Sequence, residues 1–122
     1  MLTVVVDGNN VTWALRIGGG PAVDEFLQRL EMAAASKDWE VTVIFDGPER
    51  YLPRESGLLV VWYGRGKSAD SLIERMVYEA ADRAQFVVVT EDRAEGDLVR
   101  GKGARVWSAQ RLLQEMSAEA AD

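Results

Sequence analysis

Uninterrupted apolar runs are the feature that most constrains what this chain can fold into. They cover residues 2–6, 41–45, 58–62 and 86–89, with a shorter run at 104–107. A continuous run, unlike an alternating one, is typical of a strand buried on both faces. Between the runs, over residues 23–34 and 72–81, apolar residues recur with the spacing of amphipathic helices. This alternation predicts an α/β fold with a mostly parallel sheet.

Local signals place the ends of the predicted helices. Pro21 suits the first turn of one helix, and Ser68 and Ser108 are candidate N-caps of two others. Residues 92–100 are compatible with a short helix that a following glycine ends. Between the first and second apolar runs we predict a single helix, because the polar stretch DGNN at residues 7–10 resembles a turn.

Length and composition indicate one domain without disulfides. The 122 residues are 48% hydrophobic and 28% charged, and we expect a single domain over residues 1–116 and a disordered tail over residues 117–122. Cysteine and histidine are both absent, which excludes thiolate metal sites and the commonest general base. No segment resembles a secretory signal or a membrane span, so we expect a cytoplasmic protein.

Acidic residues follow the predicted strands at one edge of the sheet. Asp7 follows the first run, Asp46 the second, and Asp92 the fourth, while Asp70 begins the helix after the third. Open α/β sheets bind ligands at this carboxyl edge. A single Asp at such a place is most often a turn former or a helix cap. Four at one edge indicate a site.

Clustered carboxylates need a proton or a cation. Two charges 4 Å apart repel by about 4 kcal/mol at an effective dielectric constant of 20. Mg²⁺ and Mn²⁺ bind oxygen ligands and need neither histidine nor cysteine, and a bound divalent ion makes water a better nucleophile toward a phosphodiester. We therefore predict a Mg²⁺ or Mn²⁺ site among these acids, to which Asp97, in TEDRAEGD, is a further candidate.

Basic residues flank the same edge. The stretch YGRGKSADS, at residues 63–71, places Arg65 and Lys67 just before a helix N-terminus, and Arg93 follows the fourth strand. The stretch is not a P-loop, because Val61 stands where GxxxxGK[ST] needs glycine. These cations are candidates for binding a nucleic-acid backbone, the alternative being ordinary solvated loop charges. The net charge of −6 counts against a dedicated nucleic-acid coat.

The chain carries five stretches in a fixed order: VVVDGNNV, VIFDG, SADSLIER, VVVTEDRAE and GARVWSAQRLL. Together they resemble the YacP-like NYN domain, a branch of the PIN-like nuclease fold. The resemblance implies a PIN-like three-layer domain with a five-stranded sheet in the order 3-2-1-4-5. It also implies a divalent-metal site and endoribonuclease activity, in some members on messenger RNA engaged by ribosomes.

The resemblance also assigns residues to roles. It implies Asp7, Asp70 and Asp92 as the metal ligands, with Asn10 matching the asparagine of the family's Asp-Gly-x-Asn turn. The leading hypothesis is a metal-dependent endoribonuclease in which these acids hold Mg²⁺ or Mn²⁺ and Asn10 orients a ligand or a water. Asp46 is a weaker candidate for the same cluster.

Other functions are compatible with the same residues. A catalytically weak RNA- or ribosome-binding module would keep the fold, and Ser71, which stands where the family commonly has a second acid, favours it. A PIN-type toxin ribonuclease would have a similar acid layout and an antitoxin partner. A dinucleotide-binding domain is disfavoured, because DGNN and not GxGxxG follows the first run.

Overall fold

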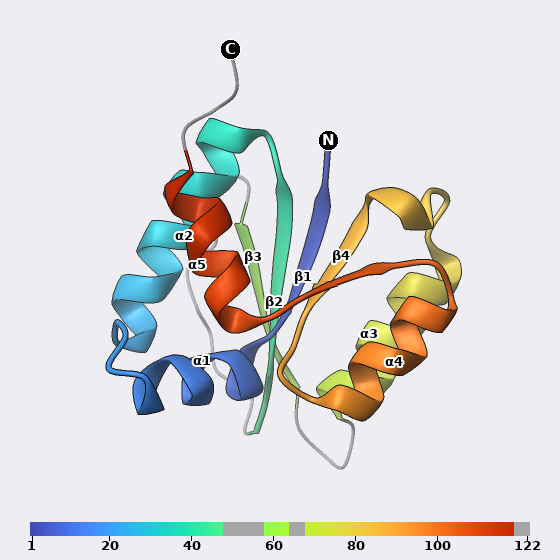
Figure 1. Ribbon diagram of the computed structural model, residues 1–122, viewed down its shortest axis with the longest axis horizontal. Coiled ribbons are helices and arrows are strands. Elements are labelled where there is room, and N and C mark those ends of the chain that lie inside the picture. Colours follow the sequence, from blue (N-terminus) through green and yellow to red (C-terminus); the bar gives the residue numbers. More distant parts are fainter. Residues whose placement is uncertain (48–57, 64–67, 119–122) are drawn as a thin grey trace.

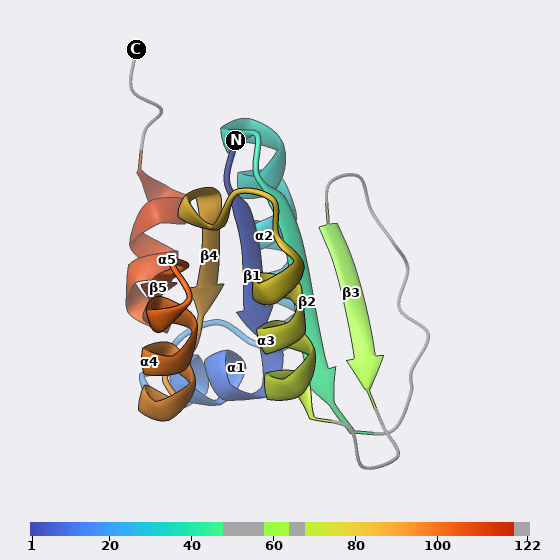
Figure 2. The same ribbon diagram turned by 90° about the vertical axis from the view of Figure 1, so that its right-hand side faces the viewer.

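The protein is a five-stranded parallel sheet between two layers of helices (Figure 1). The computed structural model describes residues 1–47, 58–63 and 68–118. The strands are β1 (Thr3–Asp7), β2 (Glu40–Asp46), β3 (Leu58–Tyr63), β4 (Phe86–Val89) and β5 (Arg105–Trp107). Their order is β3-β2-β1-β4-β5, and every pairing is parallel. Figure 2 shows the strands side by side and running in one direction. The predicted α/β fold and strand order are confirmed.

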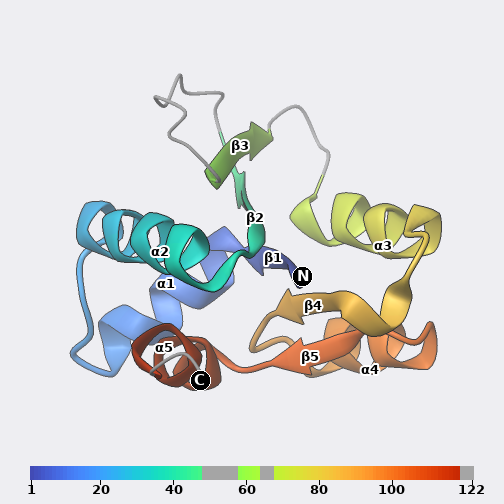
Figure 3. The same cartoon turned by 90° about the horizontal axis from the view of Figure 1, so that it is seen from above.

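Helices cover both faces of the sheet. They are α1 (Gly8–Ile17), α2 (Val23–Lys37), α3 (Ala69–Glu79), α4 (Arg93–Gly101) and α5 (Ala109–Ser117), with a short 3-10 turn, η1 (Arg83–Gln85), before β4. Seen from above, α1, α2 and α5 lie on one side of the sheet and α3 and α4 on the other (Figure 3). Within the described residues, no helix is both long and apolar enough to cross a bilayer.

The first strand shows why its apolar run is continuous. Val4 and Val6 pack into the core beneath α1, α2 and α5, whereas Val5 packs into a second core beneath α3 and α4. All three are fully buried, so each face of the strand needs an apolar residue. Because successive side chains alternate, Asp7 follows Val5 toward the side of α3 and α4.

The largest difference from the sequence prediction is α1, which begins at Gly8 where we expected a turn. Gly8 does not have a positive φ; it is needed for close packing. A Cβ atom built there would lie 2.7 Å from Phe45 Cδ1 and 2.8 Å from the carbonyl oxygen of Ile44. Only glycine therefore lets this helix start against β2 without a shift of the neighbouring strand.

The predicted caps of two helices are confirmed. Ser68 Oγ accepts a hydrogen bond from the backbone N–H of Ser71 (3.2 Å) at the start of α3, and Ser108 Oγ accepts one from that of Arg111 (3.0 Å) at the start of α5. Pro21 lies two residues before α2, which begins at Val23. Residues 119–122 of the expected tail, and Arg65 and Lys67, lie outside the described residues.

Candidate metal centre

Three acidic side chains meet at the carboxyl edge of the sheet, next to the boundary between β1 and β4. They are Asp7, Asp70 and Glu95, and one carboxylate oxygen from each lies within 4.8 Å of the others. Asp7 and Glu95 are each only 4% exposed, and Asp70 is half-buried. In a sheet of order 3-2-1-4-5, chain connections leave β1 and β4 in opposite directions, which is where such sheets bind ligands.

Each of these acids is positioned by a different element. Asp7 ends β1 and faces α3 and α4 by the alternation described above. Asp70 lies in the first turn of α3 and Glu95 in the first turn of α4, so both helices place a carboxyl group at the end nearest Asp7. Asp7 also precedes α1, and the backbone N–H of Asn10 is close enough to its carboxylate to lower its pKa.

Three helix N-termini converge on these acids. The helices α1, α3 and α4 all begin at the lower edge of the view in Figure 1. The unpaired N–H groups and the macrodipole at a helix N-terminus favour negative charge. The fold therefore offsets part of the repulsion among three adjacent carboxylates, and it does so with backbone groups that do not ionise.

Burial and mutual repulsion change the ionisation of this group. The pKa of Asp7 is raised to about 6, chiefly by loss of hydration; its hydrogen bond with Glu95 lowers this pKa, and the charges of Asp70 and Asp46 raise it. Burial raises the pKa of Glu95 to about 9, helped by hydrogen bonding and repulsion with Asp7 and then Asp70. Without a cation, Glu95 is thus the group that holds a proton.

The donor set fits a divalent cation. Its ligand atoms are carboxylate oxygens, which Mg²⁺ and Mn²⁺ prefer. Glu95 Oε2 is within 3.0 Å of Thr90 Oγ1, whereas Glu95 Oε1 is buried and, among the described residues, has no partner while Glu95 is ionised. Either a proton, shared with Asp7, or a cation satisfies that oxygen. Cation binding would displace the proton.

The prediction named Asp92 as the third ligand, whereas the structure groups Glu95, and not Asp92, with Asp7 and Asp70. Asp92 is exposed and caps α4, because its Oδ1 accepts hydrogen bonds from the backbone N–H groups of Ala94 (3.0 Å) and Glu95 (3.2 Å). It thus orients the first turn that carries Glu95. A Glu one turn into a helix does not stand at a strand end, which is why the strand-end pattern missed it.

Two further candidates lie outside the group of three. Asp46 ends β2, and its Oδ1 accepts a hydrogen bond from the backbone N–H of Ala69 (2.7 Å), the first residue of α3. It therefore positions the helix that carries Asp70, and its charge raises the pKa of Asp7. Asp97 is exposed on α4 and pairs with Arg100 (3.3 Å).

Paired asparagines fix the start of α1 between two neighbouring loops. Asn9 Oδ1 accepts a hydrogen bond from the backbone N–H of Asp46 (2.6 Å), and Asn10 Oδ1 accepts one from that of Glu91 (2.5 Å). Glu91 Oε1 in turn accepts a hydrogen bond from the backbone N–H of Ala109 (2.7 Å), at the start of α5. Asn9, Glu91 and Thr90 were not singled out from the sequence; their roles depend on long-range contacts.

Comparison with known proteins assigns the chain to a family. The family model of the YacP-like NYN domain matches residues 19–122. The chain belongs to this family. The match includes Asp70 and Glu95, while Asp7 precedes it. The predicted resemblance is thus confirmed, and the fold around the three acids is nuclease-type.

Solved structures similar to this NYN domain include two of Rae1 (YacP) from Bacillus subtilis. The first has a TM-score of 0.76 at 25% identity and covers 95% of this chain and 74% of that chain. The second, a W164L mutant, has a TM-score of 0.72 at 25% identity and covers 93% and 73%. A search of curated proteins found no match.

Proposed function

We propose that this NYN domain is an endoribonuclease that hydrolyses RNA phosphodiesters with the help of Mg²⁺ or Mn²⁺. The observation that carries the proposal is the buried group of Asp7, Asp70 and Glu95 at the carboxyl edge of a nuclease-type fold. A divalent ion bound there would lower the pKa of water and offset the negative charge of the phosphodiester.

The chain's own residues would prepare this site. Asp7, Asp70 and Glu95 would hold the ion, and Glu95 would release its proton as the ion binds. Asn10 would keep the loop after β4 in place through its bond to Glu91. Catalytic roles for Asn10 and Asp92, and a direct contact of Asp92 with the metal, stay predictions.

Phosphate binding completes the proposal. Arg93, in the first turn of α4, is exposed and would contact the RNA backbone, as would Arg65 and Lys67 from outside the described residues. As a finer proposal, supported by the YacP family, the substrate is messenger RNA in a ribosome-linked, cytoplasmic setting.

An RNA cleavage assay tests the proposal. Purified protein is incubated with single-stranded and structured RNA, with Mn²⁺, with Mg²⁺ and with a chelator. We expect cleavage that depends on the metal and that is lost in Asp7→Asn and Glu95→Gln. Glu79→Gln is the matched control, because Glu79 is an exposed carboxylate at the far end of α3 and its loss should leave cleavage unchanged.

Cleavage that survives Asp7→Asn or the chelator would contradict the proposal. A different outcome, RNA binding that needs no metal and leads to no cleavage, would instead select the alternative of an RNA-binding module with the same fold.

A further inference from the structure

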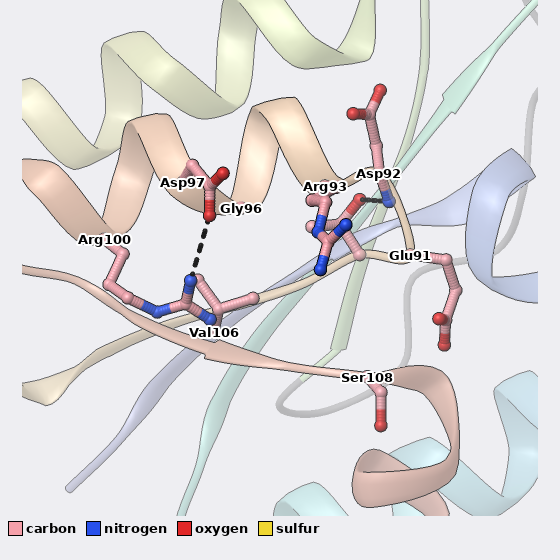
Figure 4. A pocket seen from close by; sticks show the side chains of 9 residues that line it. Glu91, Asp92, Arg93, Gly96, Asp97, Arg100, Val106 and Ser108 are labelled. Atoms are coloured by element: carbon pink, nitrogen blue, oxygen red, sulfur yellow. Dashed lines mark hydrogen bonds and ion pairs between the residues drawn. The ribbon is translucent and has the colours of Figure 1, made fainter.

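A cavity of about 430 Å³ lies beside the acid group, on the β5 side of α4. Its wall is formed by the loop after β4, by α4 and by the segment that carries Val106 and Ser108 (Figure 4). Thr90 belongs both to this wall and to the acid group, because its hydroxyl lies 3.0 Å from Glu95 Oε2. The cavity is of a size typical for a ligand site and adjoins the acid group at Thr90.

The acids of this cavity are engaged within the protein. Glu91 accepts from the backbone N–H of Ala109, Asp92 caps α4, and Asp97 pairs with Arg100. Arg93 differs from them. Figure 4 shows its guanidinium group pointing into the space between α4 and the segment with Val106, and among the described residues it has no hydrogen-bond or ion-pair partner.

Arg93 is also unfavourably placed for the stability of its own helix. It is the first residue of α4, where the helix macrodipole disfavours a cation. An exposed, unpaired guanidinium group at this position has no structural partner to offset that cost. A bound anion would supply one, and Arg matches the geometry of phosphate oxygens well.

The charge of the chain is unevenly distributed, and basic residues are concentrated in the segment that contains α4 and β5. The overall charge is −6, yet residues 93–111 contain five basic residues and only two acidic ones. One of the two acids, Glu95, is buried, and the other, Asp97, is paired with Arg100. This stretch is therefore locally basic within an acidic chain, and Arg93 and Arg100 are the two of its cations that line the cavity, beside the engaged acids Glu91, Asp92 and Asp97.

We propose that this cavity holds the phosphodiester backbone of the RNA strand next to the bond being cleaved, with Arg93 and Arg100 as its phosphate-binding residues. The proposal rests on the proposed function, and it adds a direction: the strand leaves the acid group past Thr90 and runs over α4 toward β5. Arg93 binds directly, and Arg100 exchanges part of its pairing with Asp97 for a phosphate.

The salt dependence of RNA binding tests this path. A fluorescent single-stranded oligoribonucleotide is titrated with protein in EDTA, and the logarithm of the association constant is plotted against that of the salt concentration. For single strands each lost phosphate contact reduces the slope by about 0.7. We expect a reduction of about 0.7 for Arg93→Gln and about 1.4 for Arg93→Gln with Arg100→Gln.

Arg75→Gln is the matched control. Arg75 is an exposed arginine of α3 that pairs with Glu79 (3.1 Å) and lies outside the cavity wall, so its loss changes the net charge equally and should leave the slope unchanged. Urea unfolding of each variant confirms that the fold is kept. Slopes that stay equal to that of the unaltered protein, or that fall equally in the control, would overturn the proposal.

The two proposals fail separately. Metal-dependent cleavage with unchanged slopes would leave the endoribonuclease in place and remove this strand path. Reduced slopes without any cleavage would keep the strand path in an RNA-binding protein and remove the hydrolytic activity.

Discussion

Glu95→Gln is the most informative single substitution, because it removes the ability of the side chain to ionise while keeping the hydrogen bonds of its neutral form. The protonated carboxyl of Glu95 lies against Thr90 Oγ1 and Asp7. The glutamine oxygen can accept from Thr90 as Glu95 Oε2 does, and its amide can donate to Asp7. The variant thus imitates the state that we infer for the protein without metal.

The expected magnitude follows from the pKa of Glu95. Burial raises it from 4.5 to about 9, so below pH 4.5 the folded and unfolded chains are both protonated at this position. At pH 7 the unfolded chain has lost the proton and the folded chain has kept it. The free energy of unfolding therefore falls by about 3 kcal/mol between pH 4.5 and pH 7 because of this group. Glutamine cannot ionise, so the variant escapes this loss.

Urea unfolding without metal measures the difference. From pH 4.5 to pH 7, we expect the variant to gain about 3 kcal/mol relative to the unaltered protein, seen as a relative rise of about 1–3 M in the urea midpoint. Adding Mn²⁺ at 100 times its dissociation constant should stabilise the unaltered protein by about 2.7 kcal/mol and the variant by much less. A stability difference that does not change with pH would refute the assignment of the proton to Glu95.

Three further predictions concern the surroundings of the acid group. Gly8→Ala should lower the free energy of unfolding by about 1–3 kcal/mol, because the added methyl collides with β2; an unchanged urea midpoint would contradict this packing. Asn10→Ala should remove the hydrogen-exchange protection of the Glu91 amide, which NMR can follow residue by residue; protection that persists would show that the amide has another acceptor. Asp46→Asn should lower the pKa of Asp7 in an NMR titration of its carboxyl carbon, since one repelling charge is lost; a pKa that stays the same or rises would refute that coupling.

Much of the fold could be predicted because buried parallel strands have a strong local signature. Val4, Val5 and Val6 identify β1 without any knowledge of its neighbours, since a strand covered on both faces needs consecutive apolar residues. The role of Ser68 as an N-cap could also be predicted, because a cap forms its hydrogen bond with a residue only three positions later. The strand order, in contrast, came from the family resemblance.

The start of α1 could not be predicted in this way. Glycine and asparagine are poor helix formers, and the polar stretch that begins α1 resembles a turn. Its helical form depends on Asn9 and Asn10 bonding to backbone groups of loops far away in the sequence, and on the close approach of Gly8 to β2. Tertiary contacts therefore stabilise a helix start that the local sequence disfavours.

The sequence contains a weaker indication that Glu95 belongs to the site. It is buried together with Gly96 and Val99, and Glu95 and Val99 are four residues apart, so they share one face of α4. A carboxyl group on the apolar face of a short helix, just after a strand-end acid, is worth testing as a ligand. The distinction between Asp92 and Glu95 needed three-dimensional positions, since a cap and a ligand can both follow a strand.

The bond from Glu91 to the first residue of α5 has a consequence for the order in which the protein is made. β1 is synthesised first, but its neighbour β4 comes late, and the loop that joins β4 to α4 is held in part by a helix that comes later still. The acid group therefore cannot be complete on a growing chain until Glu95, and with it most of the described residues, has left the ribosome. Translation itself delays any activity that depends on this site.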